Sequence, residues 1–250
     1  MGGMTEAARG QYHDDGFVRL PGFADQATCA AMLDDVVEVT RAQAAGAPEP
    51  DALVLPEANL VGRDGRPEQL ASKVFRLHRR DVFGAFARSD AVTDLVADLV
   101  GPSLDCFLSQ FIFKNPGAWG QPWHQDSHYF PFEPARPIVG VWLAVTEATL
   151  ENGCLHVLPG SHREPVHDHV PDRRPNANYG YVEIIDHDTA PSVPVLMDPG
   201  DLLLFDSHLM HRSTDNESDG VRAAMVYHYC ATGTVERTKG LVNDFVTVRP

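Results

Sequence analysis

The sequence predicts one domain in which an α-helical N-terminal layer packs on a mainly β core, a sandwich or jelly roll. The chain has 250 residues, which suits a single large domain. Helical spacing of apolar residues is confined to the first hundred positions. From Ser103 onward, short apolar runs are separated by Gly, Pro or Asn, a pattern typical of many short strands. We expect the helical layer at about 12–100 and the β core at about 103–232.

The expected N-terminal layer begins with residues 12–23, a short strand with a turn at each end. Asp25 can cap a helix that runs to about Ala45, because apolar residues recur along it at intervals of three and four. Ser89 can cap a second helix through Leu99, which a Gly-Pro pair ends.

The β core is predicted from apolar runs that are each bounded by turn-forming residues. These runs are about 5–10 residues long and contain β-branched or aromatic residues, so they suit strands better than helices. The runs, in chain order, are LDCFLSQFIF, IVGVWLAVT, CLHVLP, VPVLM, DLLLF and AAMVYHYC.

Two long segments, residues 46–68 and 160–192, lack such patterns and are rich in Pro, Gly and polar residues. We expect the first to be a mobile flap and both to set specificity, since long loops often cover binding sites. Histidines in or near the second segment are His156, His162, His167 and His169. Histidines on loops of an acidic protein are usually solvated, so a second metal site is not predicted from them.

Charge and composition exclude several classes of function. The formal net charge is −15, with 35 acidic and 20 basic residues, so nucleic acid is not an expected partner. There is no apolar run long enough to span a membrane and no leader-like core in residues 1–11, so we expect a cytoplasmic protein. The four cysteines lack a CxxC pair and are expected to be reduced.

The strongest chemical signal is His124-Gln-Asp126, which places two ligating side chains on one side of an extended segment. A third ligand from a later strand would complete the two-histidine, one-carboxylate set used for non-haem Fe(II) and oxygen chemistry. His208 and His211 are both available for that position. Alone, His-x-Asp is a weak pattern that a hydrogen-bonded core pair would also produce. Arg222, eleven residues after His211, could pair with a carboxylate co-substrate rather than a surface acid.

These residues lie in longer stretches that resemble the phytanoyl-CoA dioxygenase family of Fe(II)/2-oxoglutarate oxygenases. The similarity extends over about 12–231 and is densest from His124 onward. The stretches that carry it are WHQDSHYFPF, IVGVWLAV, ENGCLHVLPGSH and PGDLLLFDSHLMHRSTDN, followed by Arg222. The resemblance implies a double-stranded β-helix, the cupin-like form of the jelly roll, with iron in its mouth.

The resemblance also implies roles for individual residues. His124, Asp126 and His211 fall on the iron ligands, since His208 falls where the family has an apolar residue. Arg222 falls on the arginine that holds the distal carboxylate of 2-oxoglutarate. Further family positions that line 2-oxoglutarate are matched by Ser213, Gln125, Trp142, Gln110 and Lys73, the last two by a looser alignment. The residues after the ligands, His128, Tyr129 and Phe130, either line the substrate pocket or pack the barrel mouth.

The implied cofactor is Fe(II), with 2-oxoglutarate and O2 as co-substrates and a small molecule as the substrate. The reaction would oxidise an unactivated C–H bond, by hydroxylation or by cyclisation, desaturation or epimerisation. Asp126 supplies a carboxylate where related halogenases have a small residue, which disfavours halogenation. The family includes acyl-CoA 2-hydroxylases and natural-product tailoring enzymes.

The charge of the chain favours the tailoring enzymes, because coenzyme A carries several negative charges. The two loops contain only scattered arginines, namely Arg63, Arg66, Arg163, Arg173 and Arg174. A neutral or cationic metabolite is therefore expected unless those arginines converge at the mouth of the pocket. Two remote alternatives are a zinc hydrolase or isomerase using the same three ligands and a barrel that only senses a carboxylate. Neither explains both the complete triad and Arg222. Nothing in the sequence predicts the oligomeric state.

Overall fold

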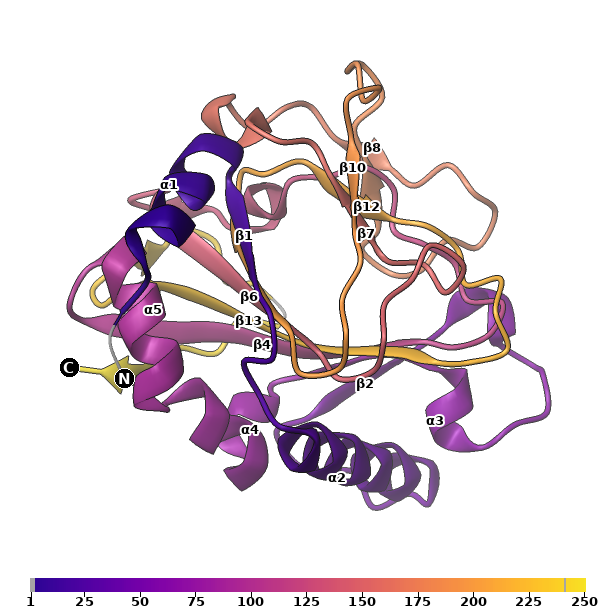
Figure 1. Cartoon of the computed structure of the whole chain (residues 1–250). Helices are drawn as coiled ribbons and strands as arrows, with labels where there is room; N and C mark the ends of the chain where they lie inside the picture. Colours follow the sequence, from indigo (N-terminus) through magenta and orange to yellow (C-terminus); the bar gives the residue numbers. More distant parts are fainter. Residues whose placement is uncertain (1–2, 241) are drawn as a thin grey trace.

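The computed structural model describes residues 3–240 and 242–250, and its centre is a large antiparallel sheet (Figure 1). No helix within these residues is long and apolar enough to cross a bilayer. The strand order is β1 (Phe17–Leu20), β11 (Leu202–Asp206), β6 (Ile138–Ala144), β13 (Arg222–Ala231), β4 (Leu104–Lys114), β3 (Ala71–Phe75) and β2 (Leu53–Pro56), with β15 (Val246–Arg249) also pairing with β4.

A smaller antiparallel sheet faces the large one and completes the jelly roll (Figure 1). Its strands, in order, are β10 (Val193–Val195), β7 (Leu155–Val157) and β12 (His211–Ser213). Two short ribbons pair β5 (Phe132–Glu133) with β14 (Val235–Glu236) and β8 (Val170–Pro171) with β9 (Val182–Glu183). Each apolar run predicted as a strand forms one, and the predicted jelly roll with N-terminal helices is confirmed.

Helices cover the face of the large sheet that points away from the small one (Figure 1). They are α1 (Glu6–Asp15), α2 (Gln26–Ala44), α3 (Pro67–Leu70), α4 (Asp81–Ala87) and α5 (Asp90–Val100). Short 3-10 turns lie at η1 (Ala58–Leu60), η2 (Leu77–Arg79), η3 (Asp126–Tyr129) and η4 (Ser161–Arg163). The predicted caps are confirmed, since Asp25 and Ser89 accept hydrogen bonds from Thr28 N and Val92 N.

Two N-terminal expectations were wrong. Residues 12–15, expected as the turn before a short strand, belong to α1, whose weak apolar face buries only Tyr12, while the strand itself forms as β1. The supposed flap at 46–68 contains β2, which pairs with β3 at the edge of the large sheet. The apolar run from Leu53 to Leu55 explains this strand, because its side chains gain burial by pairing with an edge that is otherwise open.

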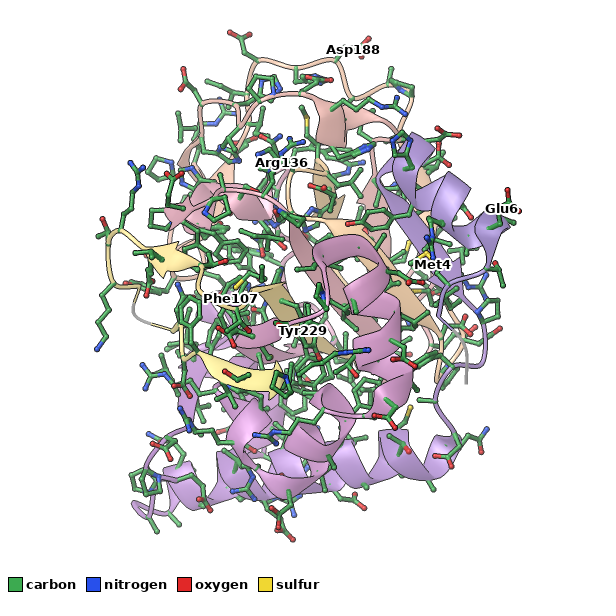
Figure 2. The ribbon with its side chains drawn as sticks, turned by 90° about the vertical axis from the view of Figure 1, so that its left-hand side faces the viewer. Met4, Glu6, Phe107, Arg136, Asp188 and Tyr229 are labelled. Carbon is green, nitrogen blue, oxygen red and sulfur yellow. The ribbon has the colours of Figure 1, made fainter. Side chains whose placement is uncertain are left out.

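Strand β13 divides the interior into two parts, because its side chains alternate between faces. Tyr227 and Tyr229 point toward the helices, where their hydroxyls donate to backbone carbonyls of Phe83 and Ala87. Figure 2 shows Tyr229 inside the fold, while the side chains of Glu6 and Asp188 lie at its periphery. Even-numbered residues from Arg222 to His228 face the small sheet instead. The space between the two sheets is where polar side chains gather.

Candidate active site

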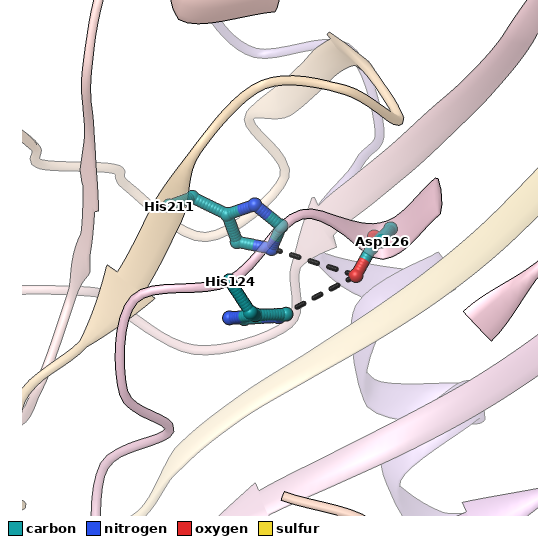
Figure 3. A group of neighbouring side chains, drawn as sticks. All are labelled: His124, Asp126 and His211. Carbon is teal, nitrogen blue, oxygen red and sulfur yellow. Dashed lines mark ion pairs between the residues drawn. The ribbon is translucent and has the colours of Figure 1, made fainter. Parts of the chain in front are cut away.

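His124, Asp126 and His211 meet between the two sheets (Figure 3). His124 Nε2 lies 3.4 Å and His211 Nε2 lies 3.8 Å from Asp126 Oδ1. The backbones of the two histidines bond reciprocally, each N–H donating to the other's carbonyl oxygen at 3.0 Å. Two ligands from distant parts of the chain are thereby held together by main-chain bonds. The predicted triad is confirmed as a buried group of two imidazoles and one carboxylate.

The imidazoles of the triad are oriented for metal binding. Nδ1 of His124 lies 2.8 Å from Pro122 O, and Nδ1 of His211 lies 2.9 Å from Leu209 O. A carbonyl oxygen only accepts, so Nδ1 carries the proton on both rings and Nε2 presents a lone pair to the centre. Burial lowers the pKa of His211 to about 4, which keeps that ring neutral near pH 7. The donor set therefore fits Fe(II).

Asp126 is held by a third histidine that the sequence analysis missed. His228 Nε2 lies 2.7 Å from Asp126 Oδ2, leaving Oδ1 to face the two imidazoles. Burial alone would raise the pKa of Asp126, but the surrounding histidines hold it well below its usual range. His228 lies six residues after Arg222 on β13 and therefore on the same face of the strand. That even spacing was the signal that could have identified it.

A cavity of about 310 Å³ opens beside the triad. Its inner wall contains Arg222, whose side chain is 1% exposed and lies 5.6 Å from the centre of the Trp142 ring. One guanidinium nitrogen donates to Gly153 O at 3.2 Å, while Nε and Nη1 have no partner. Burial lowers the pKa of Arg222 to about 10, so the group remains a cation near neutral pH. A buried guanidinium without an acidic partner fits a carboxylate ligand.

Two lysines line the same cavity, Lys114 buried and Lys73 partly buried. Lys114 is opposite Arg222 in the β4–β13 register, and its Nζ donates to Ser213 Oγ at 2.8 Å and Thr214 O at 2.5 Å. Lys73 Nζ lies 3.2 Å from Gln121 Oε1. Burial lowers the pKa of Lys73 to about 8 and that of Lys114 well below its ordinary value. Among the lining residues that the structure describes, Asp126 is the sole carboxylate, so the cavity suits an anion.

Of the residues predicted to line the co-substrate or substrate, most lie in the wall of the cavity and two lie outside it. The cavity is lined by Lys73, Gln110, Trp142, Ser213, Arg222, Tyr129 and Phe130. Gln125 does not line it. Its amide donates to the carbonyls of Pro165 and His208, and its Oε1 accepts from His167 N, because residues between two alternating ligands point to the opposite side. His128 is also outside and stacks on His169 at 4.2 Å.

His208, the other candidate for the third ligand position, is not part of the triad. Its Nδ1 lies 2.7 Å from Ser127 Oγ, and its backbone N–H donates to Asp206 Oδ1. This histidine sits in the turn between β11 and β12, whereas His211 begins β12 and so faces the cavity. The assignment of His211 as the third ligand is confirmed.

Comparison with known proteins identifies a family for this site. A family model described as phytanoyl-CoA dioxygenase (PhyH) matches residues 12–224. A probable phytanoyl-CoA dioxygenase of Caenorhabditis elegans is 35% identical over 176 residues, covering 67% of this chain and 56% of that protein. The peroxisomal phytanoyl-CoA dioxygenase of Rattus norvegicus is 32% identical over 168 residues, covering 65% and 50%. The chain thus spans about half the length of these curated relatives.

Solved structures with the same fold include two that bind metal. The epimerase SnoN in complex with Fe3+, alpha-ketoglutarate and nogalamycin RO superposes with a TM-score of 0.69 at 21% identity, covering 94% of this chain and 87% of that one. EctD from S. alaskensis with bound Fe gives a TM-score of 0.71 at 21% identity, covering 91% and 77%. At this identity the likeness is one of fold.

Proposed function

Because the chain belongs to the phytanoyl-CoA dioxygenase family of Fe(II)/2-oxoglutarate oxygenases, we propose that it oxidises an unactivated C–H bond of a small metabolite. Hydroxylation and oxidative cyclisation are the two outcomes we favour, and natural-product tailoring is the setting. The observation that carries the proposal is that the complete triad shares its cavity with Arg222, a buried cation that has no acidic partner. A cytoplasmic location stays a prediction from the sequence.

In this proposal 2-oxoglutarate lies between the triad and Arg222. Arg222 binds the distal carboxylate through the two nitrogens that have no protein partner. Ser213 and Lys114 complete the anion site, and Trp142 closes one side of it. A bound dianion would stabilise the charged forms of Lys73 and Lys114, which burial disfavours, because a nearby opposite charge favours the cation.

Iron held by the triad would supply the redox chemistry that couples decarboxylation of 2-oxoglutarate to oxidation of the C–H bond. The protein supplies orientation. His228 directs one oxygen of Asp126 toward the two imidazoles, and main-chain carbonyls fix the tautomers of the imidazoles. Phe205 packs edge-on against His211 at 5.3 Å and excludes water from that side.

Away from Arg222 and Lys114, the walls of the cavity support an uncharged substrate. Apolar and aromatic side chains line much of it, including Leu55, Phe75, Leu108, Phe130 and Val242. An acyl-CoA would need cations for its phosphates near the opening. The five loop arginines singled out in the sequence are absent from the described lining.

Most of those arginines are occupied by acidic or backbone partners. Arg66 pairs with Glu68 and Arg173 with Glu183. Arg174 binds Asp172, and Arg163 donates to the carbonyl of Asp14. No cluster of free loop cations for a pyrophosphate is therefore formed by these residues.

Acyl-CoA 2-hydroxylation is the second candidate function, and the names of the two curated relatives described above favour it. An assay of succinate release with Fe(II), 2-oxoglutarate and O2 compares two sets of candidate substrates. One set contains uncharged glycosides and amino-bearing metabolites, and the other contains branched and straight acyl-CoA esters. Turnover of the uncharged set supports the proposal, and efficient turnover of acyl-CoA esters alone would replace it with the second candidate.

An anaerobic titration tests the cofactor pair before any substrate is known. With Fe(II) bound, 2-oxoglutarate should produce a saturable visible charge-transfer band at one equivalent. Arg222→Ala should keep Fe(II) binding but raise the 2-oxoglutarate concentration for half-saturation by about 100-fold, since a charge-assisted hydrogen bond contributes roughly 1.5–3 kcal/mol. Absence of the band with Fe(II) bound would contradict the oxygenase proposal and favour the hydrolase or sensor alternatives.

A further inference from the structure

A second group of metal-binding side chains lies outside the cavity, in the long segment that follows β7. Glu164 comes directly after η4, His167 three residues later, and His187 from the far end of the same segment. Glu164 Oε2 is 2.8 Å from His167 Nε2 and 3.0 Å from His187 Nε2. All three ligand atoms lie within 4.8 Å of one another. Asp188, the neighbour of His187, lies at the periphery of the molecule (Figure 2).

The hydrogen bonds of His187 show that either a proton or a metal ion must lie between these groups. Its Nδ1 lies 2.9 Å from the carbonyl oxygen of Asp188, so Nδ1 carries a proton. In the neutral ring, Nε2 then presents a lone pair to Glu164 Oε2. A glutamate side chain is ionised near neutral pH, so Glu164 Oε2 also presents a lone pair. Two lone pairs at this distance repel unless a proton or a metal ion lies between them.

We infer that Glu164, His167 and His187 form a second metal site that takes a divalent transition ion such as Zn2+. Two imidazoles and one carboxylate are a donor set that zinc favours, whereas Ca2+ and Mg2+ require mainly oxygen. The side chains of Glu164, His167 and His187 are 39%, 25% and 19% exposed, so an ion can enter from solvent. A water molecule would occupy the remaining position.

The ion would join the two ends of the segment that closes one side of the active-site cavity. Tyr179, Gly180 and Tyr181, which line the cavity, lie between His167 and His187 in the chain. The segment is also tied to the triad, because the side chain of Gln125 bonds the backbone of Pro165 and His167. Zinc at this site would therefore hold in place a wall of the substrate pocket without taking part in the oxidation.

Zinc uptake by metal-free protein tests this inference. Because the donor set of the triad also suits zinc, the second site is measured in a His124→Ala/His211→Ala variant. Wild type should bind two equivalents after dialysis against micromolar Zn2+, and the triad variant one. Adding His167→Ala/His187→Ala to the triad variant should abolish binding. His13 is an exposed histidine on α1, so His13→Ala is the matched control and should leave the number of bound zinc equivalents unchanged.

Limited proteolysis adds a measurement that does not depend on counting ions. In the triad variant, Zn2+ should slow cleavage within residues 165–187 at least tenfold, and Glu164→Gln should remove that protection. Glu164→Gln keeps the shape of the side chain, so a folded circular-dichroism spectrum separates lost binding from lost structure. One equivalent in wild type and none in the triad variant would overturn the inference and assign the cluster to a protonated histidine–carboxylate bridge.

Discussion

At the scale of single residues, His228 illustrates how a side chain outside the metal triad can control it. It is 1% exposed, bonds one oxygen of Asp126, and has no partner for Nδ1. His228→Ala would free the carboxylate to rotate, and outer partners of this kind typically affect metal affinity by about 10–100-fold. We therefore expect anaerobic Co2+ titration to show weaker binding by that factor. His228→Gln, which retains a donor, should restore part of it, and unchanged affinity in both variants would remove the positioning role.

Lys114 is expected to act on the co-substrate rather than on the metal. It lies beside Arg222 and donates to Ser213, so its charge faces the proposed position of the distal carboxylate. Lys114→Met should raise half-saturation by 2-oxoglutarate about 10–100-fold, because a hydrogen bond to a charged group contributes roughly 1.5–3 kcal/mol. Isothermal titration of the Co2+-loaded protein measures this directly. The exposed Lys239→Met is the control, and equal affinities in the two variants would contradict the assignment.

Which residues could be predicted from the sequence follows from how local their signals are. His124 and Asp126 are two positions apart on extended backbone, so their common direction was predictable. Gln125 was assigned to the co-substrate only through the family resemblance, although the same alternation turns it away from the cavity. Lys114 and His228 join the site because β4 and β13 are paired, which no local pattern indicates.

At the scale of elements, β6 depends on a glycine that lies directly opposite a cavity residue. Gly140 pairs with Phe205 in the β6–β11 register, and a Cβ at this position would meet the Phe205 ring at 2.2 Å. Gly140→Ala should lower the free energy of unfolding by about 1–3 kcal/mol, the usual cost of overpacking. Because Phe205 contacts His211, metal affinity should fall as well.

A glycine in α1 provides the control for this prediction. A Cβ on Gly10 would meet no heavy atom within 4 Å. Gly10→Ala should stabilise the protein by up to about 1 kcal/mol, since alanine has the higher helix propensity. Urea unfolding followed by circular dichroism measures both variants. Equal midpoints for the two would show that the sheet tolerates the added methyl group.

Elements with strong local signals were predictable and those with weak ones were not. Capping residues and helical spacing placed α2 and α5 within a residue or two of their observed bounds. Helix α1 has only a weak apolar face, and β2 is an edge strand inside a segment dominated by turn-forming residues. Both are stabilised by contacts with residues distant in the chain, for which one sequence contains no direct signal.

At the scale of the whole molecule, buried neutral histidines should make stability depend on pH. Burial lowers the pKa of His208 to about 4, and burial also lowers the pKa of His78. An unfolded histidine binds a proton near pH 6.5, so the unfolded state gains protons first as the pH falls. The stability contributed by the neutral ring is therefore present above pH 6.5 and is lost as the pH falls toward 4. Between pH 7 and pH 5, His208 alone should lower the free energy of unfolding by about 2 kcal/mol.

Urea midpoints measured from pH 7 to pH 5 test this expectation. Wild type should lose stability across the range, and His208→Leu should show a flatter dependence whatever its absolute stability. The comparison of slopes is informative because it does not depend on how well leucine packs. A variant as steep as wild type would mean that His208 is not protonated preferentially in the unfolded chain.

The reciprocal main-chain bonds between His124 and His211 have a practical consequence for the ion itself. Because the two ligands are joined through their backbones, stripping the metal with a chelator should leave the fold and the ligand positions intact. The ion then behaves as an exchangeable part whose identity is decided by supply, and affinity generally rises from Mn2+ and Fe2+ toward Cu2+. Protein purified on a nickel column would carry the wrong ion and be inactive until reloaded. The same exchangeability lets Co2+ serve as a coloured reporter for the variants that keep the triad.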